Sequence, residues 1–297
     1  MEKRQTCDLA GIWRFEIDKE DRGFAEHWEK RRLTQTITLP GCLQAQGYGD
    51  AISKDTPWVQ SLYDALWYQR GEYAYAQENG TKVPFLSQPP RHYTGKAWYQ
   101  KTIFVPEKSD GFVGRLTLEN TKWKTTLWID GECKGSVVSL CAPHVYETGA
   151  LSAGEHTVTL CIDNGWQLPY RPDGHGVSDA LGATWNGVAG AITLELFNGI
   201  WIERVKVNAQ MPQAAIQVHL KNETSHTQNC IVHVQDTVHT DISADAVCVL
   251  TPGSQICELT LNYPSDTPLW DEFDQGLQHL IVCLLYTSPS PRDMRRS

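Results

Sequence analysis

Apolar and polar side chains alternate along much of this chain with a period of two, which is the pattern of a strand with one buried face. The first clear case lies at 12–17, where Trp13, Phe15 and Ile17 fall on one face and Arg14 on the other. The same pattern predicts further strands at 35–39, 97–105, 115–120, 123–130, 156–162, 191–197 and 200–207.

Two local signals refine this series of strands. Asp130-Gly131, directly after the strand at 123–130, is a strong signal for a hairpin turn. Only residues 24–32 favour a short helix. The pattern therefore predicts an all-β fold that begins with a jelly-roll β-sandwich over 1–208, decorated by long loops.

A second series of strands begins near residue 214. Its later members are expected at 230–235, 246–250, 255–261 and 277–284. Short strands at this spacing with polar connections are typical of a small immunoglobulin-like sandwich. We therefore expect an incomplete immunoglobulin-like β-sandwich over 209–284, with the boundary near Asn208–Pro212.

The end of the sequence breaks the strand pattern. Residues 285–297 are polar and rich in Pro, Ser and Arg, and they resemble the translated adapter sequence that contaminates assembled reads. We interpret them as a non-native tail, so that the native chain stops within a strand near Leu284. A genuine disordered tail is the alternative.

Length and charge narrow the class of protein. A chain of 297 residues suits two domains of ordinary size. The net charge of −9 and the isoelectric point near 5.6 argue against nucleic acid or an anionic membrane as a partner. The chain has no long apolar run and no secretory signal at its start, so a cytoplasmic protein is expected. A periplasmic or secreted location stays open if the true start is missing.

The cysteines and histidines give no pattern of a metal site. The nine cysteines are odd in number, form no C-x-x-C pair and lie in several cases at apolar strand positions, so reduced structural thiols are expected. A disulfide framework or a metal site is the alternative. Four histidines of the second series of strands are expected to face solvent: His219, His226, His233 and His239. We therefore expect no metal and no other cofactor.

Six segments of the chain are rich in aromatic residues, glycines and strand-forming residues, and they follow one another in a particular order. They are LAGIWRFEID at 9–18 with LPGCLQAQGYG at 39–49, GKAWYQKTIFVP at 95–106, WKTTLWIDGECKGS at 123–136, HVYETGALSAGEHTVTLCIDN at 144–164, ATWNGVAGAITLEL at 183–196 and PLWDEFDQGLQHLIVCL at 268–284. Together they cover nearly all of residues 9–284. In this order they resemble the N-terminal part of the family 2 glycoside hydrolases, which include β-galactosidases, β-glucuronidases and β-mannosidases.

The resemblance implies part of a retaining enzyme that hydrolyses β-linked glycosides. In the family, two glutamates on a (β/α)₈ barrel after the immunoglobulin-like module act as acid/base and nucleophile. No alternating series of strands and helices is present here, and no Asp or Glu matches the family's catalytic motifs. We therefore assign no catalytic residue and expect this fragment alone to be inactive.

The resemblance also implies that loops of the first domain help to hold the sugar. The best candidate is the loop 171–187, whose predicted substrate-binding residues are His175, Asp179, Trp185 and Asn186. Carboxylates and amides bond sugar hydroxyls, and Trp stacks on a sugar ring. The β-galactosidase pattern has an Asp two residues before this Trp, where Ala183 stands here, so Asp179 replaces it only through a different loop path. The alternative is a loop that packs Trp185 onto its own sandwich.

An aromatic-rich insertion at about 48–95 also has two interpretations. It is either a stacking platform for the substrate or, as we favour, an excursion that folds over the sandwich and packs on itself. For the whole chain, the leading hypothesis is the substrate-site rim and scaffold of a glycosidase, with a carbohydrate as its partner. The rival is a stand-alone carbohydrate-binding module, because fold alone does not settle function. A scaffolding role in a homo-oligomer also stays open.

Overall fold

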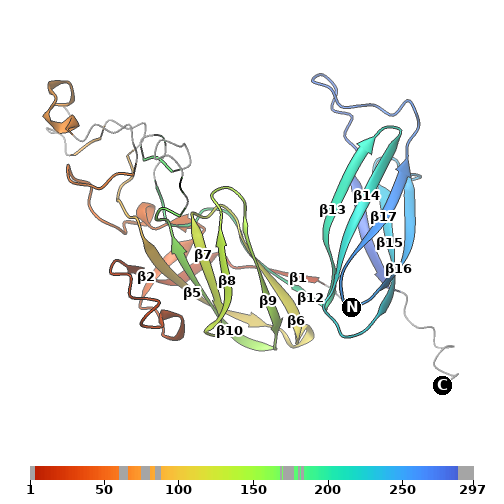
Figure 1. The fold of residues 1–297 in the computed structure, drawn as a ribbon, viewed down its shortest axis with the longest axis horizontal. Coiled ribbons are helices and arrows are strands. Elements are labelled where there is room, and N and C mark those ends of the chain that lie inside the picture. The colour runs from red at the N-terminus through yellow and green to blue at the C-terminus, as the bar shows by residue number, and fades with distance from the viewer. Residues whose placement is uncertain are drawn as a thin grey trace. The chain divides into compact units, whose positions relative to one another are not determined.

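The computed structural model describes residues 4–59, 66–74, 81–83, 88–167, 169, 177–179, 181 and 184–286. The chain forms two compact units, Met1–Leu196 and Phe197–Ser297 (Figure 1). Of the residues that the structure describes, 53% lie in strands and 6% in helices. The predicted all-β class is therefore confirmed. The described part of the chain contains no helix with the length and hydrophobicity needed to cross a membrane.

The first unit is built on two main sheets. The four-stranded sheet has the order β1 (Arg4–Asp8), β12 (Ile192–Phe197), β6 (Phe112–Leu118) and β9 (His144–Leu151). The six-stranded sheet has the order β3 (Gln35–Leu39), β2 (Gly11–Asp18), β5 (Lys96–Val105), β10 (Gly154–Asp163), β7 (Lys124–Ile129) and β8 (Glu132–Val138). A small sheet joins β4 (Gly41–Cys42) to β11 (Gly187–Val188).

The inner faces of these strands form the main hydrophobic core of the unit. Trp13 and Phe15 of β2 are fully buried in it, as their alternation with Arg14 predicts. Tyr99 of β5 packs against Phe15, with ring centres 5.1 Å apart. Burial of side chains of this size is the main source of stability for a sandwich.

The outer face of the six-stranded sheet is also partly covered. Trp98 of β5, Trp128 of β7 and Cys161 of β10 form a second buried cluster with Trp28 and Leu33 of the segment between β2 and β3. The indoles of Trp98 and Trp128 are stacked, with centres 5.0 Å apart and planes 28° apart. Alternation fails as a guide here because both faces of β7 are buried.

The prediction of a helix over 24–32 was wrong. This segment forms turns and a single 3₁₀ turn, η1 (Trp28–Lys30). His27 has a φ of 52°, in the left-handed region, and an α-helix cannot continue through that conformation. The carboxylate of Asp18 holds the segment instead, because it accepts hydrogen bonds from the backbone amides of Arg22 and Gly23, both at 2.8 Å.

The hairpin predicted at Asp130-Gly131 joins β7 to β8. Ile129 pairs with Glu132 across the turn, and both central residues have positive φ, 51° at Asp130 and 80° at Gly131. Positive φ at both positions defines the type I′ turn, whose twist matches that of the two strands. A dipeptide signal in the sequence thus gives the local geometry directly.

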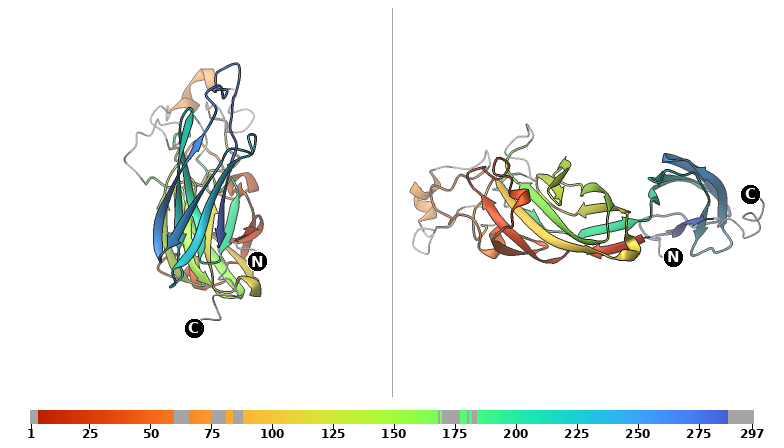
Figure 2. Two further views of the ribbon diagram at one scale, coloured as in Figure 1. Left: turned by 90° about the vertical axis from the view of Figure 1, so that its right-hand side faces the viewer. Right: turned by 90° about the horizontal axis from the view of Figure 1, so that it is seen from below.

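The second unit consists of two three-stranded antiparallel sheets, seen from two further sides in Figure 2. One has the order β13 (Ile200–Gln210), β14 (Gln213–Asn222) and β17 (Gly253–Asn262), and the other β16 (Ser243–Leu250), β15 (Gln228–Asp236) and β18 (Leu280–Tyr286). Their facing side chains form a core of their own, which includes Ile216, Val218 and Val232.

The strand predicted at 200–207 is β13, and it pairs with β14 of the second unit rather than with the first sandwich. The chain divides into the two compact units between Leu196 and Phe197, before the expected boundary near Asn208–Pro212. Of the segment interpreted as a non-native tail, residues 287–297 lie outside the described residues. The nine cysteines, all in the described part of the chain, are free thiols.

Candidate functional site

Four chain segments meet at one end of the six-stranded sheet, where β10 ends and β5 and β7 begin. Asn164 follows β10, and its side-chain oxygen accepts a hydrogen bond from the amide of Gly95, just before β5, at 2.9 Å. The backbone amide of Trp123, just before β7, donates to the carbonyl of Asp163 at 3.0 Å. The described part of the loop before β11 reaches the same place through Asn186.

Asn186 anchors this loop to the sheet. Its side chain is fully buried, and its amide nitrogen donates to the carbonyls of Gly95 and Ile162, both at 2.9 Å. Its side-chain oxygen accepts a hydrogen bond from the hydroxyl of Tyr99 at 2.7 Å. Because its side-chain groups are bonded inside the protein, Asn186 positions the loop and does not face solvent.

Asp179 is the second anchor, and it is 1% exposed. One carboxylate oxygen accepts a hydrogen bond from the amide of Thr184 at 2.8 Å, and the other accepts one from the amide of Val59 at 2.6 Å. In return, the amide of Asp179 donates to the carbonyl of Val59 at 2.8 Å. The carboxylate therefore ties the loop before β11 to the segment that begins the aromatic insertion.

His92 faces this carboxylate. Its Nε2 lies 3.7 Å from Oδ2 of Asp179, which is an ion-pair distance and too long for a hydrogen bond. Burial works to raise the pKa of Asp179, but His92 and the amides of Val59 and Thr184 favour the charged form and hold that pKa below its ordinary value. Asp179 is thus a carboxylate at neutral pH, held by fixed donors.

Beside these anchors lies a small hollow of about 90 Å³. It is lined by Val59, Thr94, Lys122, Trp123, Leu140, Asn164, Trp166, Val177 and Thr184. The indole of Trp166 is 41% exposed and meets Trp123 edge to face, with ring centres 5.5 Å apart. An exposed indole next to polar groups has the character of a sugar-binding surface.

Lys122 brings a positive charge to the same place. Its Nζ lies 5.4 Å from the ring centre of Trp185, within the range of a cation–π contact. Burial lowers the pKa of Lys122, because a partly desolvated ammonium is less stable than a hydrated one. An indole with an ammonium over it offers a ligand both an apolar face and a charge.

The four predicted site residues thus have different surroundings. Trp185 is half-buried near Lys122, whereas Asp179 and Asn186 are buried anchors. His175 lies outside the described residues. Lys122, Trp123 and Trp166 were not singled out as site residues from the sequence, although Lys122 stands directly before the predicted strand 123–130 and Trp123 begins it.

The described part of the aromatic insertion forms a cluster of its own. Trp67 is 1% exposed and is packed by Tyr68 and Tyr73, with ring centres 6.2 and 6.4 Å apart. Trp58 joins this cluster and also meets His92 edge to face. Tyr63, Tyr75 and Phe85 of the insertion lie outside the described residues. Within the described ranges, no set of three His, Cys, Asp or Glu side chains is placed to hold a metal ion.

Comparison with known proteins gives one similar sequence and several similar folds. No family model matches the chain. The chain is 24% identical over 225 residues to a β-glucuronidase of Paenibacillus borealis, which covers 70% of this chain and 32% of that protein. The chain thus spans about a third of the length of the curated relative that it matches.

The similar solved structures include β-glucuronidases and a GH2 β-galacturonidase. A β-glucuronidase of Ruminococcus gnavus matches with a TM-score of 0.61 and 15% identity, over 97% of this chain and 43% of that one. A GH2 β-galacturonidase of Eisenbergiella tayi matches with a TM-score of 0.61 and 14% identity, over 96% and 41%. A calcium-binding mutant of β-glucuronidase 2 from Bacteroides uniformis matches with a TM-score of 0.67 and 14% identity, over 96% and 31%. The resemblance indicated by the six segments is thereby confirmed, and the chain has the fold of the N-terminal part of the family 2 glycoside hydrolases.

Proposed function

We propose that this chain forms the rim of the substrate site and the scaffold of a retaining glycoside hydrolase that acts on β-linked glycosides. The acid/base and nucleophile chemistry belongs, on this proposal, to a barrel outside this sequence. The observation that carries the proposal is the exposed indole of Trp166 next to the Lys122–Trp185 pair, at the end of a sandwich whose fold matches that of β-glucuronidases.

The substrate we propose is a glycoside with a terminal uronic acid. Three of the similar proteins are named β-glucuronidases and one a β-galacturonidase, and a uronic acid carries a carboxylate next to its ring. An ammonium such as that of Lys122 pairs with a carboxylate, and an indole such as that of Trp166 stacks on the C–H face of the ring.

The four predicted residues take two roles in this proposal. Trp185 contacts the sugar, and we keep His175 as a contact whose surroundings lie outside the described residues. Asp179 and Asn186 act as positioning residues, because their polar groups are bonded to the backbone and to neighbouring side chains. The loop is then fixed at Asp179 and Asn186 and offers the indole of Trp185 to the ligand.

The test is a titration of the purified chain with glucuronate, galacturonate, galactose and mannose, followed by tryptophan fluorescence. We expect a response to the uronates that Trp166→Ala abolishes. The matched control is Trp270→Ala, which removes an indole that is 62% exposed in the second unit. Lys122→Gln is expected to cut the preference for glucuronate over galactose about tenfold, which is the loss of one charge-assisted contact.

A wild-type chain that responds to none of these sugars would contradict the proposed rim. A carbohydrate-binding module without an enzyme is the second candidate, and the exposure of Trp166 on a sandwich loop favours it as well. Hydrolysis of a chromogenic β-glucuronide distinguishes the two when the chain is extended by the sequence that follows in its gene. Turnover by the present chain alone would contradict the assignment of the chemistry to a barrel.

A further inference from the structure

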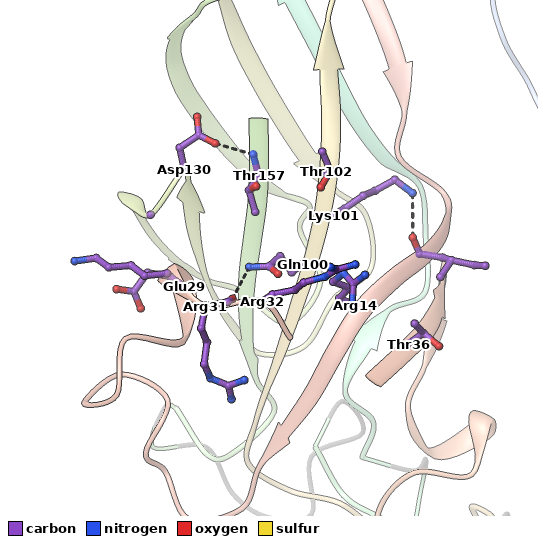
Figure 3. A pocket seen from close by; sticks show the side chains of 13 residues that line it. Arg14, Glu29, Arg31, Arg32, Thr36, Gln100, Lys101, Thr102, Asp130 and Thr157 are labelled. Atoms are coloured by element: carbon purple, nitrogen blue, oxygen red, sulfur yellow. Dashed lines mark hydrogen bonds between the residues drawn. The ribbon is translucent and has the colours of Figure 1, made fainter. Parts of the chain in front are cut away.

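A polar groove of about 740 Å³ lies on the outer face of the six-stranded sheet (Figure 3). This volume falls in the range of about 300–1,000 Å³ that is typical of ligand sites. Its walls come from β2, β3, β5, β10, the turn after β7 and the segment 29–32. None of these lining residues takes part in the hollow around Trp166.

The groove opens where two neighbouring strands separate. β2 and β5 pair from Asp18 opposite Lys96 as far as Arg14 opposite Gln100, and then the pairing ends. The first residues of β2, 11–13, pair with β3 on the other edge of the strand and have no partner in β5. Lys101 lies at this point, and its ammonium donates to the carbonyls of Ala10 at 3.1 Å and Ile12 at 3.4 Å. It thereby bonds one carbonyl of β2 and the carbonyl just before that strand, at the edge where the pairing with β5 ends.

The lining residues carry more positive than negative charge. The cations are Arg14, Lys30, Arg31, Arg32 and Lys101, and the acids are Glu29 and Asp130. Both acids are engaged, since Asp130 bonds His156 at 2.6 Å and Glu29 bonds His27 at 3.0 Å. The groove is therefore a basic site on a chain whose net charge is −9.

Two of the cations, Lys30 and Arg32, are available to a ligand. Arg31 is held by a bidentate contact with Glu16, at 3.0 and 2.6 Å, and Lys101 by the backbone carbonyls of Ala10 and Ile12. Arg14 donates through Nη1 to the carbonyl of Leu33 at 3.1 Å. In the part of the chain that the structure describes, no carboxylate pairs with Arg14, Lys30 or Arg32. Clustered cations without internal partners repel one another, and a bound anion relieves that repulsion.

We infer that this groove binds an acidic oligosaccharide that carries carboxylates, at a place separate from the hollow around Trp166. Guanidinium groups recognise carboxylates through paired hydrogen bonds, and the hydroxyls of Thr36, Thr102 and Thr157 suit sugar hydroxyls. A single-stranded nucleic acid would need aromatic side chains for its bases, and none of the lining side chains is aromatic. The anion site stands on the groove alone, and the choice of a glycan rests on the proposed function.

The test is a calorimetric titration of the full chain with a short oligogalacturonate. We expect binding that the double variant Lys30→Gln/Arg32→Gln weakens about tenfold, and that added salt also weakens. Both side chains are exposed, so the variant keeps its fold, which circular dichroism checks. The matched control, Arg204→Gln/Lys206→Gln, removes the same charge from exposed positions on β13 and is expected to bind as the wild type does.

Three results would overturn the inference. They are the absence of binding, equal binding of the methyl-esterified and therefore neutral oligosaccharide, and tighter binding of an oligonucleotide of equal charge. Trp166→Ala separates this inference from the proposed function. That variant is expected to lose the response to monosaccharides and to keep the binding of oligogalacturonate, so that either site can fail without the other.

Discussion

Asp179 illustrates how one buried carboxylate can hold together two segments that lie far apart in the sequence. Its two oxygens accept hydrogen bonds from the amides of Val59 and Thr184, and His92 stands 3.7 Å away. A buried carboxylate without such donors would be neutral at physiological pH. Here the donors keep it charged, so its contribution to stability depends on that charge.

Asp179→Asn is expected to lower the free energy of unfolding by about 2–4 kcal/mol at neutral pH, because an amide cannot accept both backbone hydrogen bonds and leaves one amide unpaired. The pKa of Asp179 is below its ordinary value, so the stabilisation is present above about pH 4 and is lost as the pH falls through the lowered value. Urea unfolding at several pH values measures it. Asp241→Asn, at an exposed position, is the control, and a difference that persists unchanged in acid would contradict the assignment.

The sequence predicts only part of this site, and distance along the chain is the reason. Trp185 and Asp179 stand in one glycine-rich loop, which the resemblance singles out. Their neighbours come from elsewhere, since Val59 lies 120 residues from Asp179 and Gln44, which accepts from the amide of Asn186, lies 142 residues away. No local pattern contains such a pairing, because the sheet brings the segments together.

At the scale of elements, the turn between β7 and β8 is braced from the neighbouring strand. His156 of β10 bonds Asp130 through Nδ1 at 2.6 Å and the carbonyl of Ser152 through Nε2 at 2.8 Å. Asp130 also accepts from the amide of Thr157 at 2.7 Å. The turn therefore rests on a histidine whose charge changes near neutral pH.

His156→Gln is expected to cost about 1–2 kcal/mol in unfolding free energy through the lost hydrogen bonds. Burial works to lower the pKa of His156, but Ser152 and Asp130 hold it above the ordinary value. The part of the stabilisation that depends on the charge of His156 is thus fully present below about pH 6, and it is lost as the pH rises through the raised pKa. Thermal unfolding at about pH 6 and about pH 9 measures this, with His226→Gln as the exposed control. An equal loss at both pH values would show that the charge on His156 plays no part.

Elements with a strong period or a turn signal could be predicted, and those set by tertiary contacts could not. β3 has the bounds that its alternation gives, and Asp130-Gly131 forms the expected turn. The segment 24–32 has helix-forming residues, but Asp18 and the indoles of the sheet hold it in turns. β8 is expected from this turn alone, because its side chains are exposed or half-buried and give no apolar stripe.

The whole molecule contains two units with separate hydrophobic cores. A substitution that destabilises the core of one unit tests whether the two units unfold separately. Leu220 is 1% exposed in the core of the second unit, so Leu220→Ala is expected to destabilise that unit by about 2–5 kcal/mol. Of the 11 tryptophans, only Trp201 and Trp270 belong to the second unit. Tryptophan fluorescence therefore follows the first unit, while calorimetry follows both.

In calorimetry, Leu220→Ala is expected to move one transition to lower temperature and to leave the fluorescence-detected transition in place. Val247→Ala, at a position that is 80% exposed on β16, is the matched control and is expected to move neither. A fluorescence transition that shifts together with the calorimetric one would show that the units unfold as a single cooperative body.

The stacked indoles of Trp98 and Trp128 have an optical consequence. Two indoles with centres 5.0 Å apart share their electronic excitations, and coupled chromophores of this kind give circular dichroism a pair of bands of opposite sign. Trp28 covers this pair from the segment that also carries Lys30 and Arg32. The protein thus contains a spectroscopic reporter packed against this segment, which registers without any label whether the segment lies on the sheet.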